Sequence, residues 1–377
     1  MSSAFQTLVV RSGHHDRLQC PVFVELPEGE YYLISAEGNI LPLQAVSANT
    51  YAFVEPYLPA NSSRTYRLLQ GEKGEARVKL RDEGEKGLSI CLGDNPLTTY
   101  HYQGVKARPY FYPLLAPDQL AVTRSYPMIP DNPDEKHDHP HHRSLWIAYG
   151  EVNDTDNWAE GEGHGYTEHK HFTEITSGDV FGRFASESVW TTNQHVPLLD
   201  QNLVVTTWAT EGGVRLVDFD IRLTANYGSV HFNDTKEGGI LSARVATVLD
   251  VPRTGTITNS FGGVNEGETW GKAAHWCDYS GIIENQRGGI AICDHPHSFR
   301  YPTHWHVRDY GLMTANPFGY SYYTKGVKNG SHTMQNGETL EFHYRLILHS
   351  GDVHSARIND HYLGFVAPPS VEVCASS

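Results

Sequence analysis

Histidine is concentrated in one short stretch of this sequence, HDHPHHRSLW at residues 137–146. Imidazole has an unperturbed pKa near 6.5, so it can take up or release a proton near neutral pH. Pro140 excludes a continuous helix through the stretch and constrains it to a turn. The pattern predicts a pocket edge suited to acid–base chemistry. Its candidate side chains are His137, Asp138, His139, His141, His142 and Arg143.

A second stretch, THWHVRDYG at residues 303–311, alternates like a β-strand. The alternation places His304, His306, Arg308 and Tyr310 on one face, and Trp305, Val307 and Asp309 on the other. Such a polar face does not suit an apolar core, and a solvated face would be richer in Lys, Glu and Thr. We interpret it as a pocket wall. The alternative is a structural hydrogen-bond network with nearby carboxylates.

Two further stretches carry groups of the same kind. FNDTKEGGI contains Lys236 beside Glu237 at a predicted strand end, which fits either a tuned acid–base pair or an exposed ion pair. AAHWCDYSG contains His275, Trp276 and Asp278. Residues so far apart can share one site only if the fold brings their strands together.

The elements between these stretches read as short strands. Gly and Pro total 55 residues (35 and 20), and they leave few windows long enough for a helix. A dozen or more segments show period-two alternation or β-branched runs, of which VRLVDFDIRLTA at 214–225 is the clearest. The spacing predicts an all-β protein with a large antiparallel β-sandwich.

The polar, glycine-bearing segment 70–76 predicts a linker. We therefore expect a small N-terminal β domain at 1–72, a large β-sandwich at 73–365 that carries the site, and a C-terminal tail at 366–377. The polar segment 153–172 is expected to be a long loop, and such loops are often functional.

Composition limits the function classes. There are 29 Lys and Arg against 44 Asp and Glu, a net charge of −15, which disfavours nucleic acid and anionic membranes as partners. The sequence shows neither a signal-peptide pattern nor an apolar run that could span a bilayer, and its five cysteines form no CxxC pair. We expect a cytoplasmic protein with reduced thiols. The 22 His, 21 Tyr and 7 Trp favour binding of a carbohydrate. The sequence leaves homo-oligomerisation open.

Several motifs together resemble one known family. RPYFYPLLAPDQLAVTRSYPM at 108–128, DHPHHRSLW, DTKEGG, HWCDYSG, HWHVRDYG and NPFG at 316–319 resemble the PmoA-like family of bacterial proteins, the DUF6807 group, over about residues 75–365. The label methane oxygenase does not suit a chain without predicted membrane spans. The resemblance implies a sandwich (supersandwich) like that of galactose mutarotase, and carbohydrate chemistry.

On such a sandwich, a histidine and a carboxylate facing a sugar ring act as acid and base. We expect His142 and His306 to transfer protons, with Lys236, Glu237 and Asp309 as further catalytic candidates. The expected substrate-binding residues are His139, His141, Arg143, His304, Arg308, Trp146, Trp276 and Tyr310. The predicted reactions are epimerisation of a sugar, or cleavage of a keto-sugar glycoside by β-elimination or hydrolysis.

Two alternatives stay open. No cofactor is firmly implied, but His137, His139 and His141 are ligand types that bind a divalent metal, which would suit a metal-dependent hydrolase, lyase or oxygenase. The aromatic residues would also fit a sugar-binding module without catalysis. That second alternative gives no role to so many groups that can exchange protons.

Overall fold

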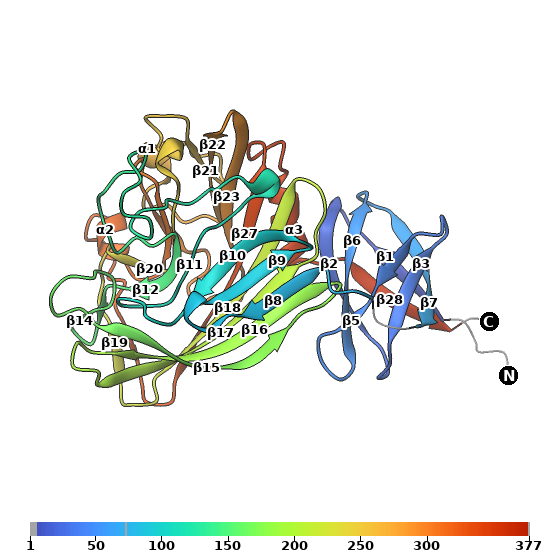
Figure 1. The fold of residues 1–377 in the computed structure, drawn as a ribbon, viewed down its shortest axis with the longest axis horizontal. Helices are drawn as coiled ribbons and strands as arrows, with labels where there is room; N and C mark the ends of the chain where they lie inside the picture. Colours follow the sequence, from blue (N-terminus) through green and yellow to red (C-terminus); the bar gives the residue numbers. More distant parts are fainter. Residues whose placement is uncertain (1–5, 72–73, 376–377) are drawn as a thin grey trace.

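The computed structural model describes residues 6–71 and 74–375. Figure 1 shows a large body and a smaller one, both built of strands. The paired strands are antiparallel, so the prediction of an all-β protein with a large antiparallel sandwich is confirmed.

Two eight-stranded sheets form the large body. Sheet I contains, in spatial order, β24 (His304–Val307), β25 (Leu312–Asn316), β20 (Gly238–Arg244), β12 (Leu145–Tyr149), β11 (Tyr110–Phe111), β10 (Asn95–His101), β9 (Leu88–Leu92) and β8 (Val78–Asp82). Sheet II contains β15 (Tyr166–Thr176), β16 (Phe181–Thr191), β17 (Pro197–Trp208), β18 (Val214–Thr224), β27 (Thr339–Ser350), β23 (Gln286–Asp294), β22 (Trp276–Ile283) and β21 (Thr256–Asn259).

Smaller elements complete the large body. A four-stranded sheet contains β14 (Thr155–Asp156), β13 (Glu151–Val152), β19 (Val230–Phe232) and β26 (His332–Met334). The helices are α1 (Asn265–Thr269), α2 (Tyr320–Tyr323) and α3 (Ile358–Val366), with short 3-10 turns at Gly84–Lys86, Pro117–Gln119 and Thr247–Leu249. Within the described residues, none of the helices has the length and apolar character needed to span a membrane.

The main core lies between the two large sheets. Alternate residues of sheet I, such as Leu145, Ala243 and Trp305, are buried there against Phe219 and Leu346 of sheet II. Strand β18 follows its sequence pattern, since its residues at odd positions from 217 to 223 are buried while Asp220 and Arg222 are exposed. One face of sheet I is therefore in the core, and its other face is also covered over β12, β20 and β25, whose residues are buried throughout.

The small body has its own core and two sheets. One contains β28 (Ser370–Ala375), β1 (Gln6–Arg11), β7 (Ser63–Gln70), β3 (Tyr31–Ser35) and β4 (Ile40–Pro42). The other contains β2 (Arg17–Glu25), β6 (Thr50–Leu58) and β5 (Gln44–Ala45). Of the expected linker at 70–76, residues 72–73 lie outside the described residues.

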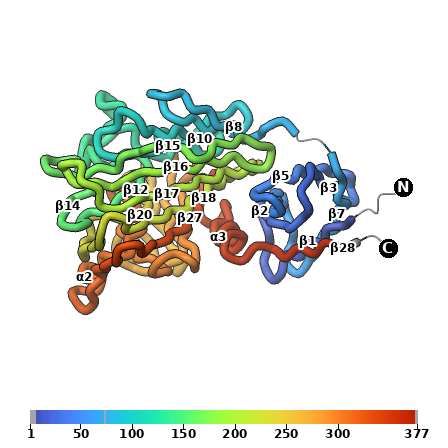
Figure 2. Tube along the Cα trace, turned by 90° about the horizontal axis from the view of Figure 1, so that it is seen from below, coloured from blue at the N-terminus to red at the C-terminus, as the bar shows by residue number. Residues whose placement is uncertain are grey.

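The C-terminal segment differs from the expected tail. After α3, which lies between the two bodies in Figure 2, the chain returns to the small body and residues 370–375 pair with β1 as strand β28. Without this pairing, β1 would be an exposed edge with unpaired backbone groups. The small domain is therefore built from both ends of the chain.

The expected loop at 153–172 is shorter than predicted. Residues 155–156 form β14, and residues from Tyr166 onward belong to β15, which is paired with β16. The sequence of β15 is polar because the strand lies at the edge of sheet II and is largely solvated.

Candidate active site on sheet I

A row of polar and aromatic residues crosses the face of sheet I that points away from the core. Residues directly opposite one another on neighbouring strands share a face of the sheet. The successive pairs connect His101, Tyr110, Trp146, Ser242, Thr314 and His306. Trp146 and His306 are three strand spacings apart, or roughly 14 Å. The predicted stretches at 137–146 and 303–311 thus flank one surface.

The histidine-rich stretch forms a tight turn above this row. The His142 N–H donates to the His139 carbonyl at 2.9 Å, which makes residues 139–142 a β-turn with Pro140 in its second position, where proline is favoured. His139 has a positive φ of 43°. A non-glycine residue in this region costs about 1–3 kcal/mol and is common at functional sites.

Four aromatic rings stack in a column across the site. Tyr310 lies parallel to His139 with ring centroids 5.2 Å apart and a 6° angle between planes. His139 lies parallel to His142 at 4.8 Å, and His142 stacks on Trp146 at 5.2 Å. The column joins the two stretches that the sequence analysis expects to meet.

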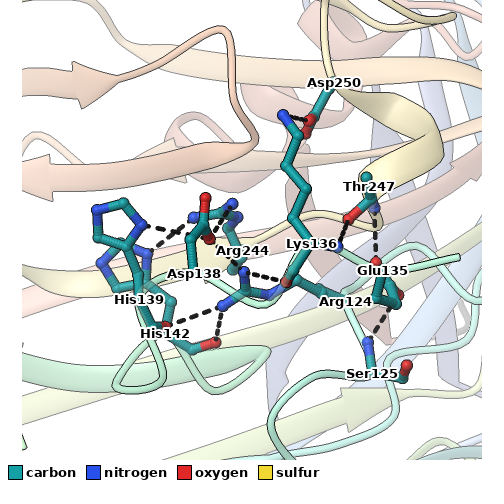
Figure 3. Close-up of polar contacts among 10 residues, drawn as sticks. All are labelled: Arg124, Ser125, Glu135, Lys136, Asp138, His139, His142, Arg244, Thr247 and Asp250. Carbon is teal, nitrogen blue, oxygen red and sulfur yellow. Dashed lines mark hydrogen bonds and ion pairs between the residues drawn. The ribbon is translucent and has the colours of Figure 1, made fainter. Parts of the chain in front are cut away.

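Two buried arginines share one carboxylate behind the column (Figure 3). Asp138 Oδ1 accepts hydrogen bonds from Arg124 at 2.6 Å and Arg244 at 2.8 Å. Arg124 also donates to the carbonyls of Lys136, His139 and His142, so it fixes the turn. Burial opposes ionisation of Asp138, but the hydrogen bond from His139 and the charges of Arg244 and Arg124 hold its pKa below the ordinary value.

The loop before the turn is anchored by two further ionic groups. Lys136 forms an ion pair with the buried carboxylate of Asp250. Glu135 accepts hydrogen bonds from the backbone N–H groups of Ser125 and Thr247 (Figure 3). The histidine turn is therefore held on a preorganised support.

The partners of His139 and His142 assign them opposite hydrogen-bonding roles. His142 Nδ1 lies 3.1 Å from Arg244 Nη1, which can only donate, so His142 carries its proton on Nε2. His139 Nδ1 lies 3.3 Å from Asp138 Oδ1, which can only accept, so Nδ1 carries a proton and, in the neutral ring, Nε2 is the acceptor. In Figure 3 both Nδ1 edges face this network, and the opposite ring edges point away from it on the same side. Burial, followed by the charges of His141 and Arg244, lowers the pKa of His142, which is neutral at pH 7.

His306, at the other end of the row, is also a neutral donor. Trp270 Nε1 donates to His306 Nδ1 at 2.9 Å, which leaves the proton on Nε2. Burial, followed by the positive charges of Lys236 and Arg308, lowers the pKa of His306 to about 3. Burial and Arg308 also lower the pKa of Lys236.

The strand carrying His306 is shorter than predicted. β24 ends at Val307, and residues 308–311 form a turn closed by the Gly311 N–H and the Arg308 carbonyl. Arg308 and Tyr310 still meet, with the guanidinium carbon 5.4 Å from the ring centroid. Asp309 instead forms two hydrogen bonds with Glu266 of α1: the backbone N–H of each residue donates to the side-chain carboxylate of the other. Glu266 also forms an ion pair with Arg308 at 2.9 Å. Asp309 thus positions the turn.

The loop after β14 contributes a buried glutamate. Arg143 binds both carboxylate oxygens of Glu160 at 2.8 Å, and Arg108 lies 3.7 Å from Glu160. Burial raises the pKa of Glu160, but Arg143 and Arg108 together hold it below the ordinary value. Arg143 therefore forms an internal ion pair with Glu160, and 16% of its side chain is exposed.

The other predicted residues are distributed as follows. His141 lies beside His142 at 4.4 Å between centroids, and burial, with the charge of Arg108, lowers its pKa to about 4. His304 is adjacent to the row and stacks on Tyr323 near α2. Lys236 and Glu237 form an ion pair with each other in the bend before β20.

Trp276 lies outside the site. It is buried with Ile358 and Tyr362 under α3, in the second core cluster at the junction with the small body. Its strand β22 belongs to sheet II, so the structure does not bring Trp276 to the row on sheet I.

The predicted metal ligands do not converge. His137 stacks on Tyr126 and its Nε2 contacts the Asn132 carbonyl, whereas His139 faces Asp138. Over residues 6–71 and 74–375, no three His, Cys, Asp or Glu side chains are arranged to hold a metal ion. The set of His137, His139 and His141 does not fit one ion, and we derive no chemical step through a metal.

Sequence reasoning missed several residues that build the site, namely Arg124, Arg244, Trp158, Glu160 and Trp270. Arg244 had a detectable signal, because it is a lone arginine in the apolar run GGILSARVA. Arg124 falls inside the motif at 108–128 without a histidine or carboxylate nearby in sequence. A cavity of about 670 Å³ lies between the two bodies, lined by Tyr31, Tyr51 and Asp179, and no predicted site residue borders it.

The fold and this surface define an all-β sandwich protein with a histidine- and arginine-rich site on one sheet. The chain belongs to a family of unknown function, DUF6807, which matches residues 87–363. The match spans most of the large body, includes the histidine turn and β24, and ends within α3. No curated protein matches the sequence.

Proposed function

We propose that this protein is a carbohydrate-active enzyme that removes a proton from a carbon next to the carbonyl of a sugar or keto-sugar glycoside. The observation that carries the proposal is the pairing of His139 and His142. Their rings are parallel, one Nε2 accepts and the other donates, and both lie on the same side. A base beside a fixed donor is what proton abstraction next to a carbonyl requires.

In this mechanism His139 is the base. Asp138 holds its Nδ1 proton and stabilises the imidazolium that forms when Nε2 takes the substrate proton. The carbonyl acidifies the neighbouring C–H bond, and its electron pair moves to form a C=C bond while the oxygen becomes an enolate. Arg244 keeps His142 neutral and oriented, so that His142 Nε2–H donates to that oxygen.

The enolate can then react in two ways. In β-elimination the electron pair returns from the oxygen, the bond from the β-carbon to the glycosidic oxygen breaks, and the leaving oxygen takes the proton held by His139. In epimerisation the same carbon is protonated again on its other face. His306, whose Nε2 also carries a proton, and Lys236 are the expected groups for protonation on the opposite face. A galactose-mutarotase-like architecture is part of this proposal.

The carbohydrate assignment rests on the lining of the site. Tyr110 and Tyr310 are partly exposed and present aromatic rings beside the row, whereas Trp146 is buried against His142 and Trp158, and the site contains several fixed donors. Flat rings stack on sugar rings, while donors bind their oxygens.

The test is deuterium exchange measured by NMR in deuterated water, with methyl β-glucoside and its 3-keto derivative as substrates. We expect exchange next to the carbonyl, or bond cleavage, with the keto derivative and the wild-type protein. The His139→Ala variant should lose it, whereas His137→Ala should retain it, because His137 faces Tyr126 outside the site. Sugar binding without exchange, change of anomer or cleavage would instead identify a sugar-binding module and overturn the proposal.

A further inference from the structure

Three donors near the histidine turn make no hydrogen bond to a described residue, although Arg108 Nη1 lies 3.7 Å from Glu160 Oε1. Arg108 Nη1, Trp146 Nε1 and Trp158 Nε1 are buried, and none makes a hydrogen bond within the described part of the chain. The side chains are 0 to 3% exposed. Indole and guanidinium N–H groups cannot accept, so only an acceptor atom can satisfy them. Leaving such buried donors unpaired is unfavourable.

These donors lie together at one end of the site. Trp158 contacts Trp146 at 5.3 Å and His142 at 5.5 Å between centroids. Arg108 Nη2 donates to the carbonyl of Ala159, the residue after Trp158. The donor group is therefore adjacent to the ring column at His142, the proposed donor to the enolate oxygen.

The charge at this end is positive, although the chain has a net charge of −15. Arg108, Arg143 and Lys106 surround the single carboxylate of Glu160. The other carboxylate here, Asp156, accepts the backbone N–H groups of residues 158 and 159. Three cations thus face two carboxylates. Burial lowers the pKa of Arg108 to about 10, as expected for a cation without full compensation.

We infer that the substrate carries a carboxylate, and that this group binds at the end of the site formed by Arg108, Trp146 and Trp158. A carboxylate offers about four lone-pair positions and no proton, so it matches donors that have no acceptor. A hydroxyl would bring a donor of its own into the same place. The inference rests on the proposed function and narrows it to acidic sugars, of the uronate or aldonate class.

Calorimetric titration with glucuronate and its methyl ester as ligands tests whether this end of the site prefers a carboxylate. With the wild-type protein, we expect glucuronate to bind about tenfold more tightly than the ester, because hydrogen bonds to a charged group are stronger. The difference should depend only weakly on salt concentration, because salt screens buried charges much less than exposed ones. Trp158→Phe, which keeps an aromatic side chain but replaces the indole with a smaller phenyl ring and removes its N–H, should weaken glucuronate binding several-fold and leave ester binding unchanged.

Equal affinity for glucuronate and its ester in the wild-type protein would overturn the inference, and this comparison needs no variant to fold. The inference would also be overturned if Trp158→Phe weakened the binding of glucuronate and of its ester alike. The same holds if the neutral 3-keto glucoside exchanged deuterium as fast as the 3-keto derivative of the corresponding glucuronide. In that last case the proposed function stands. If glucuronate binds as expected but no keto sugar exchanges deuterium, acid recognition is supported and the proposed chemistry fails.

Discussion

The imidazole of His139 and the phenol ring of Tyr310 lie parallel, 5.2 Å apart, although they come from opposite halves of the chain. Arg244 is positioned over the same Tyr310 ring at 4.8 Å and also holds His142. This contact joins the histidine turn to the end of β24.

Replacing His139 with alanine should lower kcat by about 100-fold or more, because a positioned general base typically contributes that much. The matched control is His137→Ala, two residues away in the same loop. Steady-state kinetics on the keto glycoside measures both. Similar losses in the two variants would show that the loop matters only as a whole.

Trp270→Phe should lower kcat about tenfold with little change in KM, since loss of one hydrogen bond alters the proton position on His306. The indole N–H is the group that keeps the His306 proton on Nε2. The ¹⁵N chemical shifts of the His306 ring should change at the same time. Unchanged shifts would mean that Trp270 does not set this tautomer.

Glu160→Gln should destabilise the fold by about 3–5 kcal/mol, because it leaves buried cations without their carboxylate. Urea denaturation measures the change in the free energy of unfolding. Glu162→Gln, at an exposed position in the same loop, is the control and should change it by less than about 0.5 kcal/mol.

Stability should fall as the pH decreases below about 6.5. The folded-state pKa of His306, about 3, is below the ordinary value, so in this range the unfolded chain binds a proton that the folded chain does not. Each such group costs about 1.4 kcal/mol per pH unit. In His306→Gln, the loss of unfolding free energy between pH 6.5 and 5 should be about 2 kcal/mol smaller than in the wild type. An identical pH dependence would show that His306 is protonated in the folded protein.

Deleting residues 370–377 should destabilise the small domain selectively. Strand β28 is the partner of β1, so its removal exposes the backbone of β1. Limited proteolysis should then cleave within residues 6–71 well before the large domain. If the protease cleaved the small domain of the truncated and full-length chains at the same rate, β28 would add little to the stability of that domain.

Much of the architecture could be predicted because it depends on local patterns. Alternation at 214–225 predicted the two faces of β18, and the same pattern at 304–307 placed His304 and His306 together. β15 was missed as an extended strand because an edge strand is polar on both faces, like a loop. The C-terminal strand was missed because it is defined by its pairing with β1, which is far away in the sequence.

The sequence by itself determined an all-β chain and marked the histidine turn and β24 as the places where chemistry is concentrated. Only the tertiary structure decided which groups share a site, because Arg124, Arg244 and Trp158 reach the turn through strand order and loop closure. It also decided the role of each histidine. Imidazole is chemically the same at every position, and whether its Nε2 accepts or donates depends on the partner of Nδ1, which is Asp138 for His139 and Arg244 for His142.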